Sequence, residues 1–155
     1  MRRRTLLQNL SAVAATWVAG GSGIFYSMLA NAASRPDAAF LAKDADTAMM
    51  EVLGTREATA SDQIKLDAPL QAENGAVVPI EVSTTLPSPE SVVVVVPNNP
   101  TPLLSVIETT PRTGNYFRMR IKMAGTDNVM VYVKSEGQWY VTSQEVRVAI
   151  GGCGG

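Results

Sequence analysis

One residue of this chain stands out for its chemistry: Cys153, the only cysteine among 155 residues. It lies in a strip that contains no other side chain, made of Gly151, Gly152, Cys153, Gly154 and Gly155. Glycine has no Cβ and adopts many backbone conformations, so the strip is predicted to be a flexible arm. From Ile150 to Cys153 the chain reaches at most ~10 Å when extended. The thiol is therefore expected to stand away from the body of the protein, where no apolar neighbour buries it.

The chemistry open to this thiol is covalent attachment rather than catalysis. A thiolate is a strong nucleophile, but a catalytic cysteine needs a base and an orienting group. The chain contains no histidine, and the arm contains no lysine or arginine. We therefore expect no catalytic residue, and we interpret Cys153 as a handle that partner enzymes activate. The residues also predict no metal site and no bound cofactor, because too few ligands are present.

A lone thiol leaves a second possibility open. With no other cysteine, an internal disulfide cannot form, but two copies of the chain could join through Cys153. Disulfide-linked dimers are therefore kept as an alternative state of the thiol.

The N-terminal residues 1–32 have the pattern of an export signal. Arg3 and Arg4 precede two leucines, which is typical of twin-arginine signals. The segment 11–29 has no charged residue, and Ala30-Asn31-Ala32 resembles a cleavage site. The pattern predicts export to the periplasm by the twin-arginine route, with no stable membrane association after cleavage. The alternative is an uncleaved N-terminal anchor.

The charge of the mature chain argues against one class of partner. Cleavage after Ala32 would remove three of the 13 basic residues and none of the 14 acidic ones, leaving a net charge of −4. A mildly acidic domain lacks the basic surface that nucleic-acid binding requires. We therefore expect no nucleic-acid partner.

The elements that must position the arm follow from periodicity. Apolar residues at three- and four-residue spacing predict an amphipathic helix over 37–53, with Asp44 as the point for a break and Gly54 as its end. Beyond it, six or seven short strands with a turn about every ten residues favour an immunoglobulin-like antiparallel β-sandwich. Val92 to Val96 is an unbroken apolar run, typical of a strand buried on both faces. The strand at 77–82 contains a proline, which suggests an edge or a bulge.

The expected organisation therefore has three parts. Residues 1–32 form the signal peptide, residues 33–150 form the helix and sandwich, and residues 151–155 form the arm.

One strand carries a row of positive charge. Phe117, Met119, Ile121 and Met123 alternate with Arg118, Arg120 and Lys122. The cations could bind an anion or dock a partner, but alternating charge on a half-buried strand is usually only its solvated face, and we adopt that interpretation. Methionines 119, 123 and 130 are interpreted as core residues rather than copper ligands.

Several segments make the chain resemble the SoxY family, the sulfur-compound carriers of periplasmic thiosulfate oxidation. The C-terminal Gly-Gly-Cys-Gly-Gly is the hallmark of that family. Three interior segments, 72–80, 99–102 and 120–124, are also similar to it. The resemblance runs from about Ala38 to the end of the chain.

The resemblance implies a function in which Cys153 carries sulfur while other proteins act on it. A SoxZ-like subunit would form a heterodimer with the chain. A SoxXA-like c-type cytochrome would join thiosulfate to Cys153 as an S-thiosulfonate. A SoxB-like hydrolase would release sulfate and leave a cysteine persulfide, which a SoxCD-like sulfane dehydrogenase oxidises in some organisms. The chain itself would be a non-catalytic carrier.

Two rival functions share some of these features. A ubiquitin-like thiocarboxylate carrier also ends in Gly-Gly, but it uses the carboxylate of Gly155 after adenylation by ATP, which the periplasm lacks. An interaction domain that Cys153 merely dimerises is the second rival. The adduct state of Cys153 separates both from a sulfur carrier.

Overall fold

The computed structural model describes residues 36–150, and it consists of two short helices followed by nine strands within that range. The helices are α1 (Asp37–Leu41) and α2 (Ala45–Leu53). The strands are β1 (Thr59–Ala60), β2 (Ile64–Asp67), β3 (Gln71–Asn74), β4 (Val78–Thr84), β5 (Pro89–Val95), β6 (Leu103–Glu108), β7 (Tyr116–Ile121), β8 (Asp127–Ser135) and β9 (Gln138–Ile150). No helix of residues 36–150 is long and apolar enough to cross a membrane.

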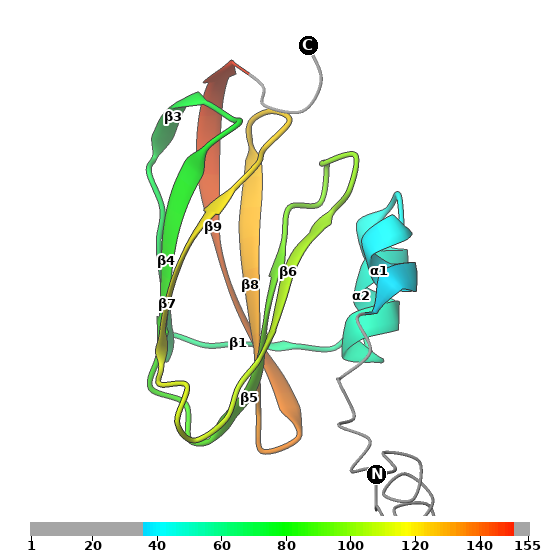
Figure 1. Ribbon diagram of the computed structural model, residues 1–155, viewed down its shortest axis with the longest axis vertical. Helices are drawn as coiled ribbons and strands as arrows, with labels where there is room; N and C mark the ends of the chain where they lie inside the picture. Colours follow the sequence, from blue (N-terminus) through cyan, green and yellow to red (C-terminus); the bar gives the residue numbers. More distant parts are fainter. Residues whose placement is uncertain (1–35, 151–155) are drawn as a thin grey trace, which may run out of the picture. The chain divides into compact units, whose positions relative to one another are not determined.

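The strands form two sheets that face each other (Figure 1). The larger has the order β1-β9-β8-β5-β6, with β3 also paired to β9, and the smaller has the order β2-β4-β7. The predicted mainly β, immunoglobulin-like sandwich with an N-terminal helix is confirmed. Its pairings are antiparallel except for two, because β1 and β3 both run parallel to β9. The short segments β1 and β3 escaped the sequence reasoning, since two to four mostly polar residues show no clear alternation.

Strand β5 separates two apolar layers, as its unbroken run of valines predicted. Val92 and Val94 face the smaller sheet and belong to the main core. Val93 and Val95 face the other way, against the helices. All four are completely buried, so this part of the strand needs an apolar residue at each of the four positions. The domain is therefore built as helices, large sheet and small sheet (Figure 1).

The helical segment breaks where Asp44 allows it. Instead of one helix over 37–53, two helices meet at Lys43 and Asp44. The backbone of Asp44 is extended, and its carboxylate accepts a hydrogen bond of 2.8 Å from the amide of Thr47, which caps α2. This bond lowers the pKa of Asp44. Gly54 ends α2 with a φ of 69°, as predicted.

The proline-containing strand is not at an edge of its sheet. Pro79 lies in β4, which is the central strand of the smaller sheet, so the sequence prediction was wrong in this respect. The reason is that β2 pairs only with the second half of β4, from Glu81 to Thr84. At Pro79 the strand has a neighbour on one side, Arg120 of β7. The missing amide hydrogen of proline therefore breaks no ladder bond on the open side.

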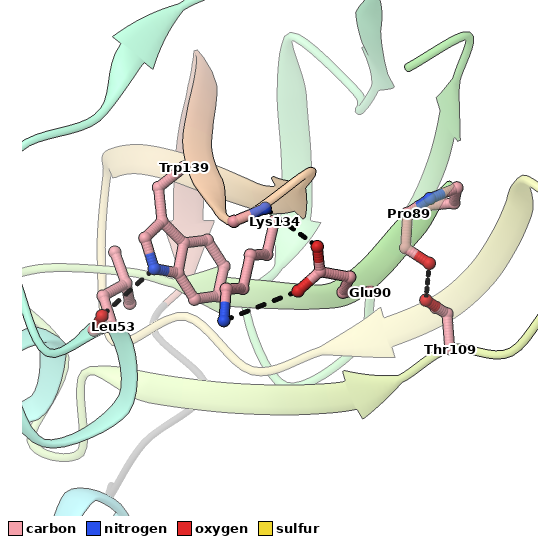
Figure 2. A network of polar contacts seen from close by, with 7 residues as sticks. Leu53, Pro89, Glu90, Thr109, Lys134 and Trp139 are labelled. Carbon is pink, nitrogen blue, oxygen red and sulfur yellow. Dashed lines mark hydrogen bonds and ion pairs between the residues drawn. The ribbon is translucent and has the colours of Figure 1, made fainter. Parts of the chain in front are cut away.

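A group of polar contacts ties the turn between β8 and β9 to the rest of the domain (Figure 2). Glu90 of β5 accepts a hydrogen bond from the amide of Gly137 at 2.9 Å and pairs with Lys134 at 3.5 Å. Trp139 donates from its indole nitrogen to the carbonyl of Leu53, at 3.1 Å. The start of β9 is thereby fixed to both the large sheet and the end of α2.

Candidate functional site

The site that the sequence points to is the C-terminal end of β9, because the predicted arm begins directly after it. Cys153 and the four glycines at 151, 152, 154 and 155 lie outside the described residues, so their predicted roles stay predictions. What the structure does describe is the support of Ile150, the last residue before the arm. We call this end of β9 the arm root, and define it as residues 147–150.

The arm root changes its pairing partner within one strand. Up to Val146, β9 pairs with β8. From Arg147 to Ile150 it pairs instead with β3, in parallel (Figure 1). The amide of Arg147 donates to the carbonyl of Leu70 at 3.1 Å, and the carbonyl of Ile150 accepts from the amide of Gly75 at 2.7 Å. The root therefore stays in a hydrogen-bonded ladder to its last residue.

The other edge of the arm root is held by a side chain. The amide of Val148 donates a hydrogen bond of 3.0 Å to the hydroxyl of Thr126, in the turn between β7 and β8. The carboxylate of Glu145 lies 3.5 Å from the guanidinium of Arg147, and both side chains are largely exposed. Val146 is fully buried and Ile150 is 68% exposed, so the root runs from the core to the surface over four residues.

The turn at residues 74–77, which is hydrogen-bonded to Ile150, is held in place by further hydrogen bonds. The side chain of Asn74 accepts a hydrogen bond of 2.8 Å from the amide of Ala76 and so shapes the turn after β3. The carbonyl of Gly75 accepts from the amide of Met123 at 2.8 Å. Gly75 thus joins β9 on one side to the segment after β7 on the other.

A second brace comes from the proline-rich loop 97–102. The side chain of Asn99 donates to the carbonyl of Lys122 at 2.8 Å and accepts from the amide of Ala124 at 2.8 Å. Asn99 is only 4% exposed, and with both bonds its amide is satisfied. Next to it, Asn98 makes two hydrogen bonds to the carboxylate of Asp127, at 2.7 and 3.0 Å.

These braces bring together three segments that lie far apart in the sequence. Residues 72–80, 99–102 and 120–124 are the interior segments that carry the family resemblance, and they converge near the arm root through Gly75 and Asn99. The supporting roles of Asn98, Asn99 and Thr126 were not found by sequence reasoning. The sequence did offer one signal for Asn98 and Asn99. Asparagines between two prolines often form side-chain hydrogen bonds to the backbone.

The cations of β7 lie on the outer face of the smaller sheet, as interpreted. The guanidinium of Arg118 is 3.2 Å from the carboxylate of Glu81, directly across on β4. A hydrogen bond between Tyr116 and the same carboxylate raises the pKa of Tyr116. Arg120 is exposed opposite Pro79, and Lys122 is exposed just beyond the end of β7.

The methionines serve packing, as predicted. Met123 is completely buried in the main core, and Met119 packs against it from β7. Met130 packs in the layer under the helices, where the hydroxyl of Tyr132 contacts its sulfur at 3.7 Å and that of Met49 at 3.1 Å. Within residues 36–150, no group of three acidic, histidine or cysteine side chains could hold a metal ion.

Comparison with known proteins gives this arrangement a family. The sequence matches the family model described as sulfur oxidation protein SoxY over residues 49–153, a match that ends at Cys153. No curated protein sequence matches the chain.

Among solved structures, the sulfur carrier protein SoxY from Chlorobium limicola f. thiosulfatophilum is similar, with 34% sequence identity and a TM-score of 0.63. The match covers 71% of this chain and 96% of the Chlorobium chain. An endo-β-1,4-mannanase from Thermotoga petrophila matches at 14% identity and a TM-score of 0.42, over 68% of this chain and 23% of the mannanase. That likeness is too weak to bear on function. By its family match and its Chlorobium relative, the chain belongs to the SoxY family of sulfur oxidation proteins.

Proposed function

We propose that this protein is a covalent carrier of sulfur intermediates, which are attached to the thiol of Cys153 while partner enzymes act on them. The observation that carries the proposal is the contrast at the arm root. Residues up to Ile150 are held by backbone bonds to Leu70 and Gly75, whereas the next five residues carry one side-chain functional group, the thiol. A firmly held base with a thin, glycine-rich extension suits delivery of one group into narrow enzyme channels.

The loading step is a two-electron oxidation. The Cys153 thiol and thiosulfate combine to form Cys153–S–S–SO₃⁻, and one proton and two electrons leave. The electrons pass to an external acceptor, for which a SoxXA-like c-type cytochrome is the proposed partner. The residues of this chain supply no redox group, so their part in the step is to present the sulfur atom.

The unloading step is a hydrolysis. Water cleaves the bond between the outer sulfur and the sulfonate, giving Cys153–S–SH and hydrogen sulfate. A SoxB-like hydrolase is the proposed catalyst, and a SoxCD-like dehydrogenase would oxidise the remaining sulfane sulfur where it is present. The chain acts here as a non-catalytic substrate carrier, in a heterodimer with a SoxZ-like subunit.

The proposed place of action is the periplasm, reached by the twin-arginine route. Arg3 and Arg4, the uncharged stretch 11–29 and the site at Ala32 support it. The two-sheet sandwich also differs from the single-sheet grasp of ubiquitin-like thiocarboxylate carriers, which favours thiol chemistry at Cys153 over carboxylate chemistry at Gly155.

The test is the intact mass of the mature protein from cells oxidising thiosulfate, measured with and without reductant. We expect S-thiosulfonate, S-sulfonate or persulfide adducts that reductant removes and that are absent from Cys153→Ser. In the reconstituted system the same variant should fold and bind its partner, yet support no thiosulfate-dependent electron transfer. Free thiol and disulfide dimer alone, or activity that survives in Cys153→Ser, would reject the carrier function.

A further inference from the structure

Asn74 and Gly75, in the turn after β3, form the only Asn-Gly pair in the chain. An Asn-Gly pair is prone to a spontaneous reaction, because the backbone nitrogen of the glycine attacks the side-chain amide carbon of the asparagine. Glycine has no side chain to hinder that attack, and its backbone adopts the conformations that the attack requires. The pair is therefore a candidate modification site that needs no enzyme.

The reaction is a deamidation through a cyclic imide. The backbone nitrogen of Gly75 loses its proton and bonds to Cγ of Asn74, and the side-chain nitrogen leaves as ammonia. Water then opens the ring. Cleavage of the new Cγ–N bond gives aspartate, whereas cleavage of the original backbone C–N bond gives isoaspartate, in which the main chain is longer by the β-carbon. No oxidant or reductant takes part.

In the folded chain, both reacting groups are engaged in hydrogen bonds. Gly75 is buried, and its amide donates to the carbonyl of Ile150 at 2.7 Å. The side-chain oxygen of Asn74 accepts from the amide of Ala76 at 2.8 Å. Asn74 itself is exposed, so water can reach it and ammonia can leave. The two hydrogen bonds therefore oppose ring closure, and we expect a slowing by a factor of about five for each and about twenty-five together.

We propose that Asn74 is a deamidation site that the arm root holds in an unreactive state, so that opening of the root leads to isoaspartate at position 74. The carbonyl of Ile150 is the controlling group, because it binds the hydrogen of the attacking nitrogen. Fraying of the end of β9 releases that nitrogen, and ring closure proceeds while the root is open. The inference is independent of the chemistry proposed for Cys153, because it involves the root and not the thiol.

Isoaspartate would prevent the root from closing again. Asn74 lies opposite Ile150 in the parallel ladder of β3 and β9. A longer main chain between residues 74 and 75 displaces Gly75 from the carbonyl of Ile150 and from the amide of Met123, to which its own carbonyl is bonded. Aspartate at position 74 keeps the length of the main chain and an oxygen for the amide of Ala76. The two products of the reaction therefore affect the root differently.

The first experiment measures deamidation of the purified full chain at mildly alkaline pH. Peptide mapping by liquid chromatography and mass spectrometry separates the asparagine, aspartate and isoaspartate forms of residue 74. We expect the folded protein to react at least about twentyfold more slowly than the same protein in urea. Folded Thr126→Val, which lacks the acceptor of the Val148 amide, should react about fivefold faster than the folded wild type.

The matched control is Thr126→Ser, which keeps the hydroxyl and should react like the wild type when folded. In urea all three proteins should react at the same rate, because the root is then absent from each. Equal rates in the folded and the unfolded wild type would overturn the proposal. A folded Thr126→Val protein that reacts no faster than Thr126→Ser would overturn it as well.

The second experiment tests the consequence of the reaction. The isoaspartate form is separated from the incubated protein and compared with Asn74→Asp, which has the same charge without the longer main chain. Hydrogen exchange at the amides of Gly75 and Arg147 should be at least about fivefold faster in the isoaspartate form, whereas Asn74→Asp should exchange like the wild type. Equal exchange in the isoaspartate form and in Asn74→Asp would reject the effect on the root.

Discussion

The amide of Gly75 and the carbonyl of Ile150 form a hydrogen bond of 2.7 Å that links the last described residue of β9 to the turn after β3. Through its own carbonyl, Gly75 also binds Met123, so one buried glycine joins three segments. The arm of a carrier needs a fixed origin, because uncertainty at its base would add to the entropy lost when it enters an enzyme. For the arm proposed at residues 151–155, this hydrogen bond would supply that origin.

The hydroxyl of Thr126 should control fraying of the arm root. Thr126→Val removes the acceptor of the Val148 amide while keeping the side-chain shape, and a lost bond of about 1 kcal/mol corresponds to roughly fivefold more opening. Hydrogen exchange at Val148 should accelerate by about that factor. Thr126→Ser keeps the hydroxyl and should exchange like the wild type; equal acceleration in both variants would contradict the role of this bond.

Asn99 should be the costliest side chain to truncate in the loop 97–102. Asn99→Ala leaves the carbonyl of Lys122 and the amide of Ala124 without partners in a poorly hydrated site, for a cost of about 2–4 kcal/mol. Urea unfolding measures it. The matched variant Asn98→Ala loses exposed bonds to Asp127 and should cost about 1 kcal/mol or less. Equal stability of the Asn99→Ala and Asn98→Ala proteins would contradict the stabilising role of the Asn99 side chain.

The indole of Trp139 should stabilise the end of α2. The carbonyl of Leu53 lies in the last turn of that helix, where no intrahelical donor is available. Trp139→Phe keeps an aromatic ring but loses the bond shown in Figure 2, so we expect a loss of about 1–2 kcal/mol in thermal unfolding. Tyr140→Phe, which removes a long exposed contact to Gln138, is the control and should be nearly neutral.

Stability should fall at alkaline pH because of Tyr132. Burial raises the pKa of its phenol above the ordinary value of 10.0 that it regains on unfolding. The stability it contributes is therefore complete below pH 10 and is lost as the pH rises through its folded-state pKa. The free energy of unfolding, measured from pH 9 upward, should decline less steeply in Tyr132→Phe than in the wild type. Parallel curves would show that other groups cause the decline.

The glycine arm should govern delivery rather than reactivity. Gly152→Val narrows the backbone choices next to Cys153 and adds bulk that a close channel must accommodate. Loading by partner enzymes should slow severalfold, whereas reaction of the thiol with a small disulfide reagent should stay at the wild-type rate. Slowing of both reactions would indicate that the valine acts on the thiol itself.

Sequence patterns predicted the parts of this fold that depend on periodicity. The run at Val92–Val96 indicated a strand buried on both faces, and the structure places helices on one side and the smaller sheet on the other. The thiol of Cys153, which we propose as the functional group, was singled out because a lone cysteine among glycines has no apolar neighbours to bury it. The family match reaches it, although the structure does not describe it.

What could not be predicted depends on contacts between distant segments. The strand that contains Pro79 was assigned to an edge because the sequence does not reveal that β2 pairs with the second half of this strand. The parallel pairing of β3 with the arm root joins residues more than 70 positions apart and involves a mostly polar strand with no periodic signal. The roles of Asn99 and Thr126 are likewise set by the backbone groups that surround them.

The position of β9 between its partners also determines how the domain bears mechanical load. Inter-strand hydrogen bonds run across the strands, perpendicular in antiparallel pairs and slanted in parallel ones, so tension applied at Ile150 along β9 acts on its ladders in shear. The nine residue pairs with β8, and those with β1 and β3, then resist together instead of opening one after another. Tension that a partner enzyme applies to the residues beyond Ile150 would therefore not detach β9 from the sheet.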